Sequence, residues 1–74
     1  MNKLQELIYT LADAPSGIQV DIWLRAIFLE WHEKTPRLID IITIRNEAAY
    51  TSACSDFIIT CLNVIIENYE ELVK

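Results

Sequence analysis

Seventy-four residues correspond to one domain, close to the lower size at which a chain buries enough surface to fold without help. The composition is 53% hydrophobic with one glycine and two prolines, and the formal net charge is −5. So few turn-forming residues predict a small number of long elements. The acidic balance, with no visible basic patch, argues against direct binding to a nucleic-acid backbone.

The sequence contains no segment of the length that a membrane span requires. The longest nearly apolar run, Phe57–Ile66, is interrupted by Thr60 and Asn63 and is about half the roughly 20 residues of a span. The first residues lack the basic flank and apolar run of a signal peptide. We therefore expect a cytoplasmic protein that does not bind a membrane.

A first amphipathic helix is predicted for Asn2–Asp13, because apolar residues recur at helical spacing along one stripe. The members of this stripe are Leu4, Leu7, Ile8 and Leu11. A second helix is expected to begin near Gly17, where Ser16 and Gln19 have the spacing of a capping box, and to end near Lys34.

The second predicted helix has two apolar faces. The broad face holds Val20, Trp23, Leu24, Ile27, Phe28 and Trp31, and the narrower face holds Ile18, Ile22 and Leu29. One face fits the core of the chain, and the other requires a further helix or a second chain. We expect Trp23 to lie in the core and Trp31, at the helix end, to lie towards solvent, where tryptophan is enriched in binding hot spots.

A third helix start is predicted at Thr35 and Pro36, with Thr35 as N-cap and Pro36 at the first helical position. No glycine or proline follows up to the C-terminal residue, Lys74. One long helix or two helices could therefore fill the rest of the chain.

The apolar stripe changes direction in the middle of this region. After Ser52 it lies roughly 150° further round the helical wheel than before Glu47. We expect a break between Asn46 and Ser52, with Asn46, Thr51 or Ser52 capping a fourth helix. A continuous helix that meets different neighbours along its length is the alternative.

The stretch Ser52–Val73 has the widest apolar arc of the chain. Its polar residues share one narrow strip: Asp56, Thr60, Asn63, Glu67 and Glu70. Such an arc is typical of a helix buried on two or three sides, so we expect this stretch to be the core helix. The predicted fold is an all-α bundle of three to four helices, a single domain over residues 1–74 that homodimerisation completes.

The two cysteines do not have the spacing of a reactive site. On one helix, Cys54 and Cys61 would lie about 10 Å apart, beyond the reach of a disulfide or of one shared metal ion. We expect both to be buried, reduced and inert, although a pair formed across a dimer remains an alternative.

No other residues suggest catalysis or metal binding. His32 is the only histidine, and we expect it on a solvated edge beside an ion pair between Asp21 and Arg25. The serines and threonines lack a spaced base and a glycine-rich loop. The sequence therefore predicts no catalytic residues, no cofactor, no metal site and no enzyme activity.

Two polar residues interrupt apolar faces and suggest contact surfaces. Arg45 projects between apolar neighbours, where it must pair, snorkel to solvent or enter an interface. Asn68 lies in line with Cys61, Val64 and Leu72, where a polar residue can set the register of associating helices or can mark fraying of the end. The predicted interface residues are Trp31, Arg45, Tyr50, Ile22, Leu29 and Asn68.

These observations favour a small acidic non-enzymatic protein that acts by protein–protein interaction. An adaptor, an inhibitor or a small regulator encoded by a phage or mobile element fits the pattern. The expected partners are a second copy of the chain and another protein. The alternative is an acidic nucleic-acid mimic that blocks the basic groove of a DNA-handling enzyme.

Overall fold

A computed structural model describes residues 2–13 and 20–74. It contains the helices α1 (Lys3–Ala12), α2 (Ile22–Glu33), α3 (Leu38–Thr51), α4 (Asp56–Glu67) and α5 (Tyr69–Leu72). Over those two ranges there is no strand, only an isolated bridge between Val20 and Cys54. The all-α prediction is confirmed, but these ranges form five helices rather than the three to four expected.

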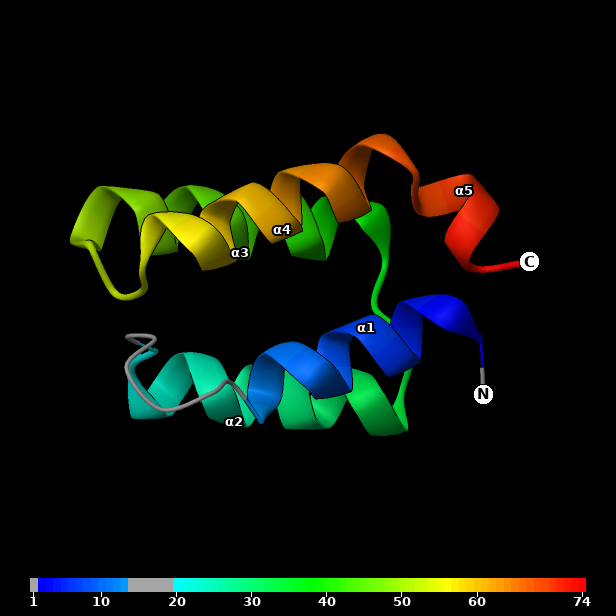
Figure 1. The fold of residues 1–74 in the computed structure, drawn as a ribbon, viewed down its shortest axis with the longest axis horizontal. Helices are drawn as coiled ribbons and strands as arrows, with labels where there is room; N and C mark the ends of the chain where they lie inside the picture. The colour runs from blue at the N-terminus through cyan, green and yellow to red at the C-terminus, as the bar shows by residue number, and fades with distance from the viewer. Residues whose placement is uncertain (1, 14–19) are drawn as a thin grey trace.

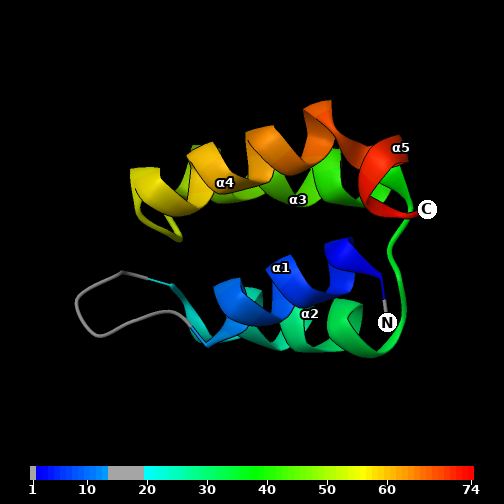
Figure 2. The same cartoon turned by 45° about the vertical axis from the view of Figure 1, so that its right-hand side comes forward.

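The helices form two stacked layers, each an antiparallel helical hairpin (Figure 1). One layer is α1 with α2, the other is α3 with α4, and α5 follows at the end of α4. Figure 2, turned by 45°, agrees with Figure 1 that α1 lies beneath α4, with α2 and α3 behind them. Contacts between α1 and α5 join the layers at the end where α4 finishes.

The buried side chains form one cluster between the two layers, and each of the four longer helices contributes to it. Its members are Leu4, Ile8, Leu11, Ala12, Leu24, Phe28, Trp31, Ile41, Ala48, Ala53, Cys54, Ile58, Leu62 and Ile65. The radius of gyration is 11.1 Å, close to the roughly 11 Å expected for a compact chain of this length.

The first helix agrees with its prediction. Asn2 and Gln5 form a reciprocal capping box, in which the Gln5 amide donates to Asn2 Oδ1 at 2.9 Å and the Asn2 amide donates to Gln5 Oε1 at 3.2 Å. Three members of the predicted stripe are buried: Leu4, Ile8 and Leu11. The fourth, Leu7, is 44% exposed.

The second helix begins later than predicted. The expected capping box of Ser16 and Gln19 lies outside the described residues, but Val20 and Asp21 are not helical. Val20 instead bridges to Cys54, and the Asp21 amide donates to the Ala53 carbonyl at 2.9 Å. These backbone partners tie the start of α2 to the other layer and so delay the helix.

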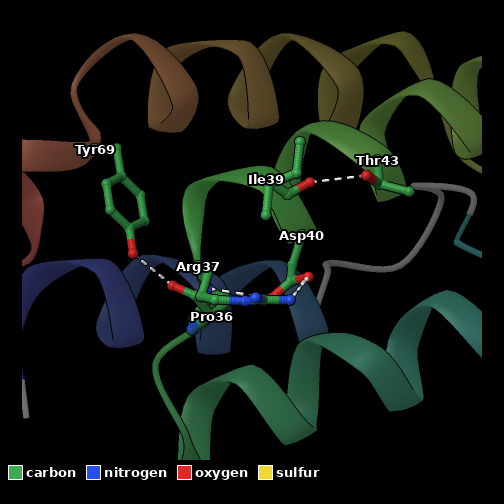
Figure 3. Close-up of polar contacts among 6 residues, drawn as sticks. All are labelled: Pro36, Arg37, Ile39, Asp40, Thr43 and Tyr69. Atoms are coloured by element: carbon green, nitrogen blue, oxygen red, sulfur yellow. Dashed lines mark hydrogen bonds and ion pairs between the residues drawn. The ribbon is translucent and has the colours of Figure 1, made fainter.

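The third helix also begins later than predicted. Arg37 is its N-cap, not Thr35, because Pro36 belongs to an extended connection that crosses between the layers. Tyr69 Oη donates to the Pro36 carbonyl at 2.6 Å (Figure 3). Arg37 then holds Asp40 in the first turn, with Nε to Oδ2 at 3.0 Å and Nη2 to Oδ1 at 3.1 Å (Figure 3).

The predicted break after the third helix is confirmed, but its caps differ from those expected. Thr51 ends α3, and Ser52 follows in the left-handed region at φ 57° as its C-cap. Ser55 is the N-cap of α4, so none of the expected residues, Asn46 among them, begins this helix. A short buried segment, residues 53–54, separates the two helices.

The last stretch is not one continuous core helix. It becomes helical only at Asp56 and is interrupted at Asn68, which ends α4 and precedes the short α5. Two members of the wide apolar arc, Phe57 and Val64, are 57% and 50% exposed. The fold thus covers the inner side of α4 and leaves part of its apolar arc uncovered.

Candidate interaction surfaces

Contacts within the first layer show which way α1 faces. Gln5 Nε2 donates to the His32 carbonyl at 3.0 Å, and the Tyr9 and His32 rings lie 4.5 Å apart between centroids. Gln5 and Tyr9 therefore lie on the flank of α1 that faces α2. Leu7 is about 160° from each of them on a helical wheel, which places it on the opposite flank.

Contacts within the second layer orient α4 in the same way. Arg45 Nη1 donates to Asn63 Oδ1, so Asn63 lies on the flank of α4 that faces α3. Cys61 lies about 160° from Asn63 on the helical wheel. Phe57, Cys61 and Val64, at i, i+4 and i+7, form a stripe on the side of α4 remote from α3.

Leu7 and this stripe lie on the same side of the molecule, because α1 lies beneath α4 (Figures 1 and 2). We call this surface the α1–α4 side and define it by Leu7, Phe57, Cys61 and Val64. Its members are at least partly exposed, and Lys3 is the charged residue one turn before Leu7. Helical spacing does not reveal this surface, because it places Phe57, Cys61 and Val64 on the same apolar arc as the core residues.

The opposite surface, the α2–α3 side, has the same periodicity but a different composition. Its members are Trp23, Ile27 and Glu30 of α2 with the C-cap Lys34, and Asp40, Ile44, Glu47 and Thr51 of α3. These positions lie on the flanks remote from the in-layer contacts of His32 and Arg45. Four of the eight residues are ionisable.

The two tryptophans have exchanged their predicted environments. Trp31 is only 8% exposed and packs on Phe28 with ring centroids 5.8 Å apart, whereas Trp23 is 39% exposed. Both predictions were wrong, because the C-terminal end of α2 is covered by its neighbours. The start of α1 bonds to His32 there, and the buried Pro36 follows.

Three other predicted interface residues are strongly exposed but do not form one surface. Ile22, which is 88% exposed, and Leu29 lie with Ala26 on the outward side of α2, which we call the α2 stripe. Tyr50, which is 91% exposed, lies at the end of α3 in the other layer. The structure therefore brings Ile22 and Leu29 together and places Tyr50 apart from them.

The two polar residues predicted for an interface have local partners. Arg45 is half-buried and donates to Asn46 Oδ1 at 2.8 Å as well as to Asn63. Asn68 is exposed at the junction of α4 and α5, where its Nδ2 donates to the Val64 carbonyl at 2.8 Å. Amide side chains thus orient the Arg45 guanidinium, and Asn68 closes the last turn of α4.

His32 does not lie on a solvated edge. It is half-buried against α1, with its Nδ1 3.4 Å from the Gln5 carbonyl oxygen. The predicted ion pair of Asp21 with Arg25 is also absent from the described ranges, because Asp21 is the N-cap of α2. This edge of α2 is used for packing between helices.

Both cysteines are free, as predicted, but they are not on one helix, and the prediction that both are buried is wrong for Cys61. Cys54 precedes α4 and is buried beside the bridge to Val20, whereas Cys61 is partly exposed. Burial raises the pKa of the Cys54 thiol, and the negative charges of Asp21 and Asp56 raise it further. Cys54 is therefore held in its neutral form.

Over residues 2–13 and 20–74, no three His, Cys, Asp or Glu side chains are grouped so that they could hold a metal ion. The helices of these residues are all too short or too polar to cross a bilayer. Comparisons with known protein families, with curated proteins and with solved structures find no match for this chain.

Proposed function

We propose that this chain is a small acidic non-enzymatic protein that acts by protein–protein interaction, as an adaptor, inhibitor or small regulator, and that it forms a homodimer. The observation that supports this function is a set of large apolar side chains left exposed around a core that is already filled. Leu7, Phe57 and Val64 lie on the α1–α4 side, and Ile22 and Leu29 lie on the α2 stripe.

The exposure does not come from a failure to fold compactly. The accessible surface is 4806 Å², close to the roughly 4,700 Å² that a folded monomer of 8.6 kDa exposes. Ile22, Phe57 and Val64 are therefore exposed on a compact body. Contiguous exposed apolar residues on such a body mark interaction sites.

The distribution of charge favours apolar contact over nucleic-acid mimicry. A mimic requires acidic groups spread along one face, as phosphates are. Here Asp40 and Glu47 lie on α3, whereas Glu67, Glu70 and Glu71 lie at the end of α4 and on α5. These acidic residues thus lie on different helices and do not follow one face, whereas the exposed apolar residues Phe57 and Val64 lie on one stripe of α4.

Copurification from the native host tests the function. We expect the tagged chain to retain a protein at high salt, and Leu29→Glu on the α2 stripe to lose it. Thr43→Glu, at an exposed position of α3, is the matched control and should retain it. Retention that salt or added DNA abolishes would instead support the mimic. Equal retention by all three chains would place the partner away from the α2 stripe, and retention of no protein by any of them would contradict the proposed function.

A further inference from the structure

We infer that the α1–α4 side is the surface through which two copies of this chain associate, about a two-fold axis that passes near Cys61. The inference rests on the homodimer proposed above and adds where the second copy binds. Its evidence is the width of this side, its charge and the spacing of the residues on α4.

A stable dimer needs a large interface, and this requirement favours a surface that is two helices wide. A stable interface buries about 800 Å² of each partner, which is roughly a sixth of the 4806 Å² accessible here. Since the Cα envelope measures 31 × 21 × 17 Å, such an interface needs a whole side of the molecule. The α1–α4 side spans two helices, whereas the α2 stripe runs along one.

The α1–α4 side and the α2–α3 side are both two helices wide, and the net charge of the chain favours the first. Two copies, each with a net charge of −5, repel one another, so their contact must avoid adding acidic groups. On α4, no ionisable group except Cys61 lies between Asp56 and Glu67. The α2–α3 side would instead bring Asp40 and Glu47 of each copy into one interface.

The spacing on α4 fits the pairing of two identical helices. Phe57, Cys61 and Val64 follow one another at intervals of four and three residues, the spacing of a helix–helix seam, and the C-cap Asn68 follows Val64 after four more. In a two-fold dimer the same patch meets itself, so a residue near its centre approaches its own copy. Cys61 lies near the middle of this row on α4, and Asn68 at its end is the polar residue that we assign to setting the register.

Light scattering coupled to gel filtration tests the surface. At micromolar concentration we expect twice 8.6 kDa for the parent and 8.6 kDa for Val64→Glu, with unchanged helical circular dichroism. Ile22→Glu, on the α2 stripe, is the matched control and should remain dimeric. Val64 is half exposed, so the variant keeps its core, and the milder Val64→Ser should show the same loss of dimer.

Four outcomes would overturn the inference. A monomeric parent would overturn the homodimer with it, while binding of another protein in the copurification would still support the proposed function. A dimeric Val64→Glu chain, or a monomeric Ile22→Glu chain, would place the interface elsewhere. Treatment with the thiol oxidant diamide should give a disulfide-linked dimer that Cys61→Ser abolishes, and its failure would move the axis away from Cys61.

Discussion

The α1–α4 side and the α2–α3 side lie on opposite flanks of the same two layers, and both repeat at intervals of four and three residues. On the first, Phe57, Cys61 and Val64 continue an apolar surface past the edge of the core. On the second, Glu30 and Glu47 occupy the equivalent positions beside apolar neighbours. Helical spacing determines which residues share one side of a helix. The charged residues among them determine whether another apolar surface can cover that side.

The largest expected effect concerns the two tryptophans, of which only Trp23 lies on the α2–α3 side. Trp31→Ala should lower the free energy of unfolding by about 3–5 kcal/mol, because it empties a buried site. In a domain of marginal stability this approaches complete unfolding. Trp23→Ala should lower the free energy of unfolding by only about 1 kcal/mol, because Trp23 is partly exposed.

Urea unfolding followed by circular dichroism, at one fixed protein concentration, measures this difference. The two variants serve as controls for each other, because both remove the same side chain from the same helix. Equal losses would mean that the α2–α3 side is covered as well as the core is.

An intermediate effect is expected for the reactivity of the cysteines with iodoacetamide. At sub-micromolar concentration Cys61, on the α1–α4 side, should react at least about tenfold faster than the buried Cys54. The raised pKa of Cys54 also delays its reaction to higher pH than that of an ordinary thiol. Mass spectrometry of digests over a pH series would detect both differences, and equal rates would show that Cys54 is not buried.

The smallest effect is expected for Asp40, on the α2–α3 side. The side-chain hydrogen bond from Arg37 lowers the pKa of the Asp40 carboxyl. The Arg37–Asp40 pair therefore stabilises the fold above about pH 3.9, the pKa of an aspartate carboxyl in the unfolded chain. This stabilisation is lost as the pH falls through the lower pKa of Asp40 in the folded chain. Asp40→Asn should lower Tm slightly at neutral pH, because the pair is exposed, and not at about pH 2.

Thermal melting at both pH values measures this effect. Thr43→Ser, on the same helix and without a change of charge, is the control. A large loss of Tm at neutral pH would show that the ion pair contributes more than an exposed pair normally does.

Much of the fold could be predicted from helical spacing. The apolar stripe that includes Leu4, Ile8 and Leu11 identified α1, and the rotation of the apolar stripe identified the break that ends α3 at Thr51. The starts of α2 and α3 were missed because their determinants are distant in sequence. Val20 pairs with Cys54 and Pro36 accepts a bond from Tyr69, and no local window contains both partners.

The candidate surfaces were predicted less well than the helices. Spacing places Phe57 and Val64 on one arc with Ile58 and Leu62, but it does not reveal which part of that arc a neighbour covers. The same limit explains Trp23 and Trp31, which share an apolar face in the sequence. Their burial depends on how α1 and the segment around Pro36 cover the end of α2.

The hydrogen bond from the Asp21 amide to the Ala53 carbonyl has a consequence for the dynamics of the fold. It joins the two hairpins outside any helix, so fraying or unwinding of a helix does not by itself break it. In hydrogen–deuterium exchange, this amide should exchange only when the layers separate. Its opening free energy then measures undocking of one hairpin from the other as a cooperative unit, a quantity distinct from the stability of each helix.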